Sequence, residues 1–353
     1  MAESPLVSIV IPHYRGKEIL YQCLTALERT SYPNTQVILV DNASSDGSVV
    51  SVSRDFPWVK VVANKVNAGY AGGCNSGLRL ARGEFVLFLN DDTVFEPDWL
   101  NPLAAALIED VSIAACQPKL LALHQRDTFD YSGAAGGLMD VFGFPFALGR
   151  IFFTLEKDEK QYDTGGEIFW ASGTAILVRK STLERVGIFD EDFFAHMEEI
   201  DLSWRFHLAG MRVVVVPQSE IFHNSGSTLT PDSFKKVYLN HRNSLVMLLK
   251  NYELNNVLWI VPVRVILELA AILYSVLKLD FVRVRAVLLA FVSVLFGLPK
   301  TLRKRADVQK TRRVSDAAIF SKMYRGSIVV DYFVRNIKRA QDLPGLHRSE
   351  FKR

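Results

Sequence analysis

The sequence predicts an α/β fold, with a mostly parallel sheet flanked by helices and a C-terminal region of apolar and basic helices. Short apolar runs of strand length alternate with helix-like stretches near the N-terminus, which is typical of βαβ units. Polar residues directly follow four of these runs, and open α/β sheets bind ligands at that edge. Of the 353 residues, 49% are hydrophobic and 22% are charged, so the chain can bury a large core.

Four apolar runs near the N-terminus have the length of strands, and three helix-like stretches separate them. The expected strands are Val7–Ile11, Val37–Val40, Val59–Ala63 and Phe85–Leu89. The expected helices are Lys17–Arg29, Ser48–Asp55 and Ala71–Ala81. Because strands and helices alternate, we expect a parallel sheet with helices on both faces.

A second block runs from about Ala114 to Asn224. It is expected to contain a strand at Phe169–Val178, a helix at Glu198–Leu208 and a strand at Arg212–Pro217. The segment Gly133–Gly149 is rich in glycine and aromatic residues, and we expect a mobile loop there.

The character of the sequence changes after residue 243. We expect one domain at 1–243, with halves of about 1–112 and 113–243, and a helical region at 244–353.

Two apolar runs dominate the helical region. Leu254–Leu279 is interrupted by Pro262, Arg264 and Glu268, and Ala286–Leu298 covers about 13 residues. Neither run gives a clean membrane span, which needs about 20 apolar residues. A basic cluster follows, formed by Lys300, Arg303, Lys304, Arg305, Lys310, Arg312 and Arg313. This order favours peripheral, monotopic or re-entrant attachment to anionic lipid. A true span and a buried dimer or packing interface are the alternatives, and a homo-oligomer stays open.

The net charge of +3 hides a division of charge along the chain. From Lys278 onward there are 18 Lys and Arg against 6 Asp and Glu, whereas the rest has 23 against 32. A basic tail on an acidic body is expected to face an anionic partner. The apolar runs beside it favour lipid, and we expect no nucleic acid.

The location that we expect is the cytoplasmic face of the cell membrane. The three cysteines, Cys23, Cys74 and Cys116, are widely spaced and suit a reducing compartment. No secretory signal peptide is evident, because Leu6 already begins a strand.

Asp91 and Asp92 directly follow the fourth expected strand. Adjacent carboxylates form a hard oxygen site for Mg²⁺ or Mn²⁺, which substrate phosphates commonly complete. A metal there would neutralise a leaving diphosphate. The alternative is a simple turn and helix cap before Pro97.

Other strand ends carry polar groups suited to a nucleotide. Asp41 ends the second strand, where an acidic side chain can bind a ribose or base, or form an ordinary Asx turn. The glycine-rich segment Asn67–Gly73 lacks the G-x-G-x-x-G spacing, which argues against a nicotinamide-binding fold. Its backbone suits either a phosphate or tight helix packing.

Two further features suit proton transfer and metal binding. Glu198, Glu199 and Asp201 lie within one helical turn, and such a carboxylate can be the general base for a hydroxyl. A solvated helix start is the alternative. His223 follows an apolar segment, so it is either a structural histidine or a further metal ligand.

Together these motifs resemble the family 2 glycosyltransferases, which have a GT-A (Rossmann-like) fold, and most of all their rhamnosyltransferase branch. The resemblance covers about residues 6–250 and rests on six motifs in the order of that family. These motifs are Ser8–Pro12, Val40–Gly47, Asn67–Gly73, Leu89–Asp92, Gly173–Ala175 and Glu198–Arg205.

The resemblance implies an inverting transfer of rhamnose or another hexose from a nucleotide-diphosphate donor. Asp41 would contact the nucleoside, Asp91 the ribose and diphosphate, and Asp92 the metal. Glu199 would be the base, and His223 a metal ligand. The two halves would bind donor and acceptor respectively.

The remaining expected contacts are divided between donor and acceptor. Pro12, Tyr14, Asn67, Gly69 and Asn90 are expected at the donor, and Asp201 and Trp170 at the acceptor.

The chain departs from the family pattern at two positions. Asn90 replaces the first acid of the metal motif, and Glu199 replaces an Asp, so the base stays open between Glu198 and Glu199.

The expected product is a polysaccharide of the cell envelope, built on a lipid-linked acceptor. The rival readings are an inactive membrane scaffold and a nucleotidyltransferase. The latter is disfavoured because the loop after strand one, Pro12–Lys17, contains a single glycine.

Overall fold

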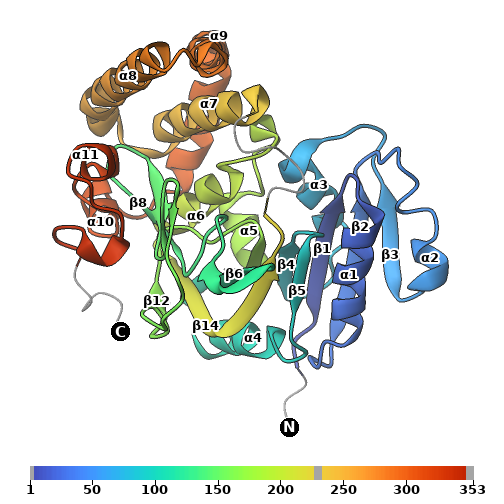
Figure 1. The fold of residues 1–353 in the computed structure, drawn as a ribbon. Helices are drawn as coiled ribbons and strands as arrows, with labels where there is room; N and C mark the ends of the chain where they lie inside the picture. The colour runs from blue at the N-terminus through green and yellow to red at the C-terminus, as the bar shows by residue number, and fades with distance from the viewer. Residues whose placement is uncertain (1–3, 226–232, 347–353) are drawn as a thin grey trace.

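The computed structural model describes residues 4–225 and 233–346 and confirms the predicted fold class. A main sheet has the order β12-β14-β6-β13-β4-β1-β2-β3, with β5 paired to β14 and β7 paired to β6 (Figure 1). Its strands are β1 Val7–His13, β2 Thr35–Asp41, β3 Val59–Ala63, β4 Phe85–Leu89, β5 Thr93–Phe95, β6 Ile113–Ala122, β7 Gln125–Phe129, β12 Gly166–Glu167, β13 Ala175–Arg179 and β14 Arg212–His223.

The first four strands of the chain are parallel, as expected. β1 pairs with β2 on one side and with β4 on the other, and β3 extends the sheet beyond β2. The rest of the sheet is mixed, because β13 runs antiparallel to both β4 and β6. β1 therefore lies where the strand order reverses, which is the usual ligand position in such sheets.

Helices cover both faces of the main sheet. On one face, α1 Lys17–Glu28 and α4 Leu100–Glu109 pack on Ile9 and neighbouring residues. On the other, α3 Gly69–Leu78, α5 Lys180–Val186 and α6 Glu198–Leu208 pack on Val10 and its neighbours. The short α2 spans Val52–Asp55, so the helix expected from residue 48 begins later.

The segment Gly133–Gly149 is not a mobile loop, and that prediction is wrong. It contains β8 Gly137–Met139 and β9 Pro145–Ala147, which form a second sheet with β10 Arg150–Ile151 and β11 Thr154–Leu155. Its aromatic and aliphatic side chains fill a core, and Phe146 is completely buried.

Two strand predictions need correction at their ends. The strand expected at Phe169–Val178 is β13, which begins only at Ala175, because the amides of Phe169 and Trp170 bond to the Gly137 carbonyl instead. β14 continues through His223, beyond the Pro217 end that we expected.

The C-terminal segment packs back onto the second sheet. α11 Ile328–Phe333 and the short η2 Ala340–Asp342 share a core cluster with that sheet, and α10 Asp316–Phe320 precedes them (Figure 1). In this way the end of the chain covers the sheet that follows β7.

Three long helices lie together above the main sheet in Figure 1. They are α7 Phe234–Asn251, α8 Leu254–Leu277 and α9 Phe281–Thr311. α7 runs across residue 243, where we expected a boundary. By length and composition alone, α8 and α9 each reach what a membrane span requires, since α9 extends well beyond the apolar run that we recognised.

The buried and exposed faces of α8 are reversed relative to an ordinary helix packed on a protein. Its buried residues are Ile260, Arg264, Glu268 and Ser275. Arg264 bonds to Glu268 and to the Gly143 carbonyl, so the charges that interrupt the apolar run face the protein. Apolar side chains point outward from both helices.

Candidate active site

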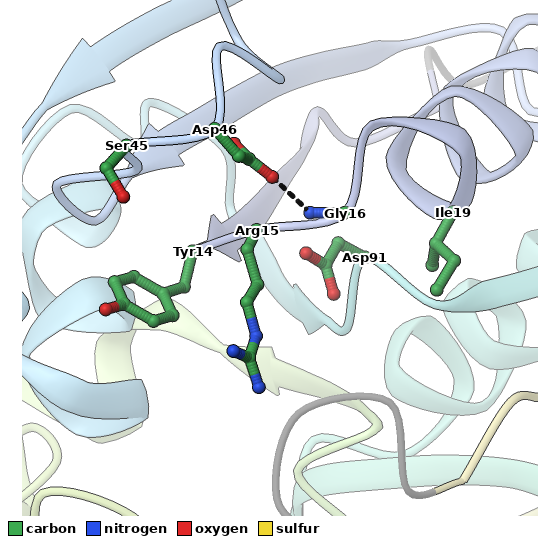
Figure 2. Close-up of a pocket in the computed structure, with 7 residues that line it drawn as sticks. All are labelled: Tyr14, Arg15, Gly16, Ile19, Ser45, Asp46 and Asp91. Atoms are coloured by element: carbon green, nitrogen blue, oxygen red, sulfur yellow. Dashed lines mark hydrogen bonds between the residues drawn. The ribbon is translucent and has the colours of Figure 1, made fainter.

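A cavity of about 420 Å³ lies beyond the carboxyl ends of β1 and β2 (Figure 2). Its lining consists of Tyr14, Arg15, Gly16, Ile19, Ser45, Asp46 and Asp91. The Gly16 amide donates to Asp46 at 2.7 Å, which joins the loops that follow the two strands. This hydrogen bond and that of Ser48 hold the pKa of Asp46 at about 2.

His13 connects the two sides of this cavity. Its Nδ1 lies 2.5 Å from Asp91 Oδ2, and its Nε2 lies 2.7 Å from Ser48 Oγ. The Ser48 hydroxyl donates to Asp46 Oδ1 at 2.6 Å. A continuous polar path thus runs from Asp91 to Asp46 through the buried His13 ring.

Asp92 belongs to a second polar chain. His223 Nε2 lies 3.0 Å from Asp92 Oδ1, and His223 Nδ1 lies 2.9 Å from Asp130 Oδ1. Asp130 also accepts from the Ser225 hydroxyl at 2.7 Å and from the Ser132 amide. The three members Asp92, His223 and Asp130 are all buried.

Burial and neighbouring charge shift the titration of these groups. Burial alone would lower the pKa of His223, but Asp92 and Asp130 outweigh it and raise that pKa to about 10. Burial, with a further contribution from Asp92, raises the pKa of Asp91.

These side chains suit a cation only with help from a ligand. Asp92 and His223 are adjacent, and once a cation has displaced the proton of His223 Nε2 they offer an oxygen and a nitrogen that can bind Mn²⁺ or Mg²⁺. In residues 4–225 and 233–346, no group of three His, Cys, Asp or Glu is placed to hold a metal. The donor set therefore fits a metal that shares the oxygens of a bound diphosphate.

Glu198 and Glu199 begin α6, and burial gives them different pKa values. Glu198 is buried, and desolvation together with Glu199 raises its pKa well above the usual range. Glu199 is partly exposed, and desolvation raises its pKa to about 7. A carboxyl with this pKa is suited to accept a proton near neutral pH.

The loop before α6 has an unusual backbone. Phe194, His196 and Met197 have φ values of 62°, 68° and 72°, a region that side chains other than glycine rarely adopt. Asn243 of α7, which is fully buried, donates from Nδ2 toward the carbonyls of Phe193, Ala195 and His196. α7 therefore fixes the direction from which Glu198 and Glu199 enter their helix.

The residues expected to contact the nucleotide lie at or after the strand ends, and each makes different contacts. Asp41 Oδ1 accepts from the Ser44 amide at 2.8 Å, as in an Asx turn, and its side chain is partly exposed. Asn67 Oδ1 accepts from Asn42 and from the Gly69 amide, so its oxygen holds the loop. Gly69 has φ 71°, and a Cβ there would meet the Phe194 carbonyl at 2.2 Å.

Pro12, Tyr14 and Asn90 lie at the same edge of the sheet. Tyr14 lines the cavity with 38% of its surface exposed. Pro12 closely faces Gly73 of α3, where a Cβ would lie 2.8 Å away. Asn90 Nδ2 lies 3.4 Å from His223 Nε2, next to the second polar chain.

The two residues expected at the acceptor lie in the protein interior. Asp201 is completely buried and bonds to Arg205, Lys250 and Asn251. Trp170 is also buried and donates from Nε1 to the Leu138 carbonyl at 2.8 Å. These contacts support α6 and the second sheet and do not favour direct contact with an acceptor.

Sequence reasoning missed His13, Asp46 and Asp130 as site residues. His13 and Asp46 lie inside motifs that we recognised, but their partners are 78 and 30 residues away in sequence. In the sequence, Asp130 is simply the residue that follows a short strand. Only the folded structure shows that it contacts His223. The burial of the Asp130 carboxylate is the signal that points to its role, and burial can be seen only in the structure.

Comparisons with known proteins show which family and which fold the chain resembles. A family model described as Glycosyl transferase family 2 matches residues 8–187, about half of the chain. The N-acetylglucosaminyl-diphospho-decaprenol L-rhamnosyltransferase of Mycobacterium tuberculosis (strain ATCC 25618 / H37Rv) is 26% identical over 261 residues, covering 69% of this chain and 84% of that protein.

Two solved structures share the fold. The structure of GalNAc-T7 with UDP, GalNAc and Mn²⁺ has a TM-score of 0.55 and 17% identity, covering 70% of this chain and 48% of that one. A mannosyltransferase of Pyrobaculum calidifontis in complex with GDP-Man and Mn²⁺ has a TM-score of 0.51 and 16% identity, covering 91% and 88%.

Proposed function

The chain belongs to glycosyl transferase family 2 and is a glycosyltransferase, and we propose that it transfers a hexose, such as rhamnose, from a nucleoside-diphosphate donor to a hydroxyl of a lipid-linked acceptor. The observation that carries this proposal is the buried chain Asp92–His223–Asp130 beside a cavity that Asp91 lines. It combines a metal-binding pair with room for a nucleotide at the reversal of the strand order.

The donor binds in the cavity at the ends of β1 and β2. Tyr14 and Asp41 contact the nucleoside, and Arg15 lies where it can meet the diphosphate. His13 holds Asp91 and the Asp46 loop together, so both sides of the cavity keep their spacing when the donor enters. Pro12, Asn67, Gly69 and Asn90 shape the surrounding loops.

A divalent metal, Mn²⁺ or Mg²⁺, belongs to this site. Asp92 and His223 would hold it, and Asp130 orients His223 through its Nδ1. When bound, such an ion supplies Lewis-acid neutralisation of the leaving diphosphate.

Glu199 is the base of the transfer. It accepts the proton of the acceptor hydroxyl as that oxygen attacks the anomeric carbon, and the bond to the diphosphate breaks on the opposite side. The anomeric centre inverts in a single displacement. Glu198, with its higher pKa, stays protonated beside it and spares Glu199 a second adjacent charge.

The lipid-linked acceptor and the membrane location rest on two observations. The mycobacterial relative carries diphospho-decaprenol in its name. The apolar outer faces of α8 and α9 are suited to lie in the interface of a bilayer, with the charged stripe of α8 turned toward the protein. We propose monotopic attachment at the cytoplasmic face, where three free cysteines are stable.

The test is release of nucleoside diphosphate from a panel of nucleotide sugars, with lipid extract as acceptor source. Wild type with Mn²⁺ should turn over one donor, and EDTA should stop it. Asp92→Ala should lower the rate by at least about a hundredfold, and Asp127→Ala, an exposed carboxylate on β7, should leave it unchanged.

The same assay distinguishes the rivals. Folded wild-type protein that releases no nucleoside diphosphate from any donor would point to a scaffold. Release of pyrophosphate from a sugar phosphate and a nucleoside triphosphate would point to a nucleotidyltransferase. Equal rates for Asp92→Ala and wild type would show that Asp92 has no role in the reaction.

A further inference from the structure

The loop of residues 194–197, which precedes α6, has a strained backbone. It belongs to no helix or strand, and φ is positive at Phe194, His196 and Met197. Side chains other than glycine rarely adopt these angles, and such strain persists only where neighbouring contacts hold it. Strained backbone is concentrated at functional sites, and Glu199 follows this loop by two residues. The contacts that hold the loop are therefore the place to look for residues that act on Glu199.

Asn243 of α7 holds this loop from within the protein. Its side chain is fully buried, and Nδ2 lies 3.0 Å from the carbonyl oxygens of Phe193 and Ala195 and 2.7 Å from that of His196. Arg242 Nε donates to Asn243 Oδ1 at 2.8 Å, which turns the two N–H groups of the amide toward the loop. Because a buried carbonyl without a donor is costly, this amide stabilises the bent path of the backbone.

Charged side chains of α9 hold the segment just before the loop. Lys304 bonds to both Asp190 and Asp192, and Lys300 Nζ lies 2.7 Å from Asp192 Oδ1. Lys250 of α7 also contacts Asp190, with 2.7 Å between Nζ and Oδ2. Only 8% of the Asp190 side chain is exposed, so water screens its ion pairs less than it screens a pair at the surface. The C-terminal helices therefore contact this segment at its start and along the loop.

The same loop also contacts the N-terminal part of the protein. The Ala71 amide, in the first turn of α3, donates to the Phe194 carbonyl at 3.2 Å. Gly69 leaves room for this carbonyl, because a Cβ there would lie 2.2 Å from its oxygen. The loop thus joins the part of the protein that contains the cavity to the C-terminal helices, and its path sets where Glu199 lies relative to that cavity.

We propose that Asn243 and Lys304 are positioning residues for Glu199. Neither side chain touches a substrate. They hold the loop and the segment before it, and so fix the place from which Glu199 accepts the proton of the acceptor hydroxyl. This inference rests on the proposed function and assigns the helical region a part in catalysis besides attachment to a membrane. Displacement of a catalytic group by about 1 Å can lower a rate about a hundredfold.

The test compares two variants of the full-length chain, each with a matched control. The first is Asn243→Ala, which removes the amide from the loop. Ser244→Ala is its control, because the Ser244 hydroxyl is also buried on α7 but accepts from Arg264 of α8 and does not contact the loop.

The second variant, Lys304→Gln, removes a cation of α9. Lys310→Gln is its control, because Lys310 is exposed and pairs with Asp307 of the same helix. When Lys304 is replaced, Asp190 keeps Lys250 as a partner, so no carboxylate is left buried and unpaired. This second pair therefore decides the matter if the first variant does not fold.

Hydrogen exchange of the backbone amides measures whether the loop is held, and it needs no substrate. In Asn243→Ala, the amides of residues 194–199 should exchange at least about tenfold faster than in wild type, with a smaller increase in Lys304→Gln. Both controls should match wild type in this segment. Unchanged exchange there in Asn243→Ala, or an equal increase in Ser244→Ala, would overturn the proposal.

Release of nucleoside diphosphate, with Mn²⁺ and lipid extract, measures the effect on the reaction. Asn243→Ala should lower kcat about 10- to 100-fold, Lys304→Gln should lower it less, and both controls should keep the wild-type rate. Binding of nucleoside diphosphate should be the same in all of these proteins, because the cavity lies at the ends of β1 and β2. Loss of that binding in parallel with kcat would show a general loss of structure and would overturn the positioning role.

The pH dependence of kcat separates positioning from a general loss of stability. The ionisable and charged side chains around the loop and its base are Glu198, Asp201, Tyr70, Cys74, His196, Lys235 and Lys236. All of them remain in Asn243→Ala. A loosened loop admits water to Glu199, so its pKa should fall from about 7 toward the ordinary glutamate pKa of 4.5, and the acid limb of kcat should move to lower pH. The acid limb of Ser244→Ala should stay at the wild-type pH.

Failure of the proposed function would give a different result. Wild type that releases no nucleoside diphosphate from any donor would count against the proposed function. Hydrogen exchange would still decide whether Asn243 and Lys304 hold the loop.

Discussion

At the residue scale, Glu198 and Glu199 differ mainly in burial, and the roles that we propose for them rest on this difference. Both carboxyls lie near Tyr70 and Cys74, Glu198 also lies near Asp201, and the described contacts provide no cation beside them. Burial therefore holds a proton on Glu198, whereas Glu199 reaches the pKa of about 7 that a base needs near neutral pH.

Replacement of Glu199 by Gln should lower kcat by about 10²- to 10⁴-fold, because the acceptor hydroxyl loses its base. In wild type, kcat should rise with pH up to about 7, since only the carboxylate accepts a proton. Single-turnover rates from pH 5 to 9 check both expectations. Glu18→Gln, in the exposed first turn of α1, is the control. A kcat for Glu199→Gln within a few-fold of wild type would transfer the role to Glu198.

The same substitution should affect stability in the opposite direction. Burial raises the pKa of Glu199 to about 7 in the folded protein, whereas the unfolded chain releases this proton near the ordinary glutamate pKa of 4.5. Stability of wild type therefore falls as pH rises between these values. The Tm of Glu199→Gln should exceed that of wild type increasingly over this range.

Sequence reasoning found the acidic pairs but not their partners. Asp91 and Asp92 are neighbours, yet their side chains contact His13 and His223, which lie on opposite sides of them in the chain. Both residues lie in the turn between β4 and β5, where the sequence does not show which way each side chain points, and only the folded structure decides what each one meets.

At the element scale, α8 and α9 form a pair of helices with apolar side chains toward the outside. Leu295 and Phe296 of α9 are 69% and 84% exposed, and Leu273 and Leu277 of α8 are similar. An apolar surface of this kind is unfavourable in water and is suited to the interface of a membrane. The basic cluster contributes less than expected, because Lys304, Arg305 and Arg312 bond within the protein.

Changing Leu295 and Phe296 together to Glu should therefore lower the vesicle-bound fraction at least about tenfold while the fold persists. Co-sedimentation with phosphatidylcholine vesicles, with and without phosphatidylglycerol, measures this. Val334→Glu is a matched control, because Val334 is 77% exposed and follows α11 on another part of the molecule. Equal loss in the control, or no loss in the double variant, would contradict attachment through α9.

Most strand and helix positions near the N-terminus were predictable from the period of their apolar residues, whereas the short α2 begins at Val52 and not at Ser48 as expected. The segment Gly133–Gly149 was not predictable, since its glycines indicate a loop while its short strands are too brief to show alternation. The roles of Arg264 and Glu268 were equally hidden. Their spacing of four residues places them on one face, but the sequence does not tell which face is buried.

At the scale of the whole molecule, ion pairs join the C-terminal helices to the catalytic body. Asp190 and Asp192 lie just before the loop of Glu199, and they bind Lys250 of α7 and Lys304 of α9. The acidic body and the basic tail therefore complement each other within one chain. The charge count along the sequence showed that the body is acidic and the tail basic, but from it we expected only an external anion as the partner of the tail.

The two parts also share a core. Trp204 of α6 packs with Tyr252, and both belong to a buried cluster with Val308, Ile319 and Met323 from the C-terminal region. The Tyr252 hydroxyl donates to the Val141 carbonyl at 2.8 Å, which ties the start of the helical region to the second sheet. A boundary near residue 243 therefore does not separate two independent cores.

Removal of residues 252–353 should consequently abolish cooperative folding and not yield a soluble catalytic domain. Each large apolar side chain lost from the cluster contributes about 1.5–3 kcal/mol, and four such losses are comparable to a whole stability of about 5–15 kcal/mol. Circular dichroism melting of the shortened chain measures this, with the full-length Leu295→Glu, Phe296→Glu variant as the soluble reference. A cooperative transition in the shortened chain, together with transfer to a water-soluble acceptor at the wild-type rate, would show that the tail serves neither the core nor a lipid-linked acceptor.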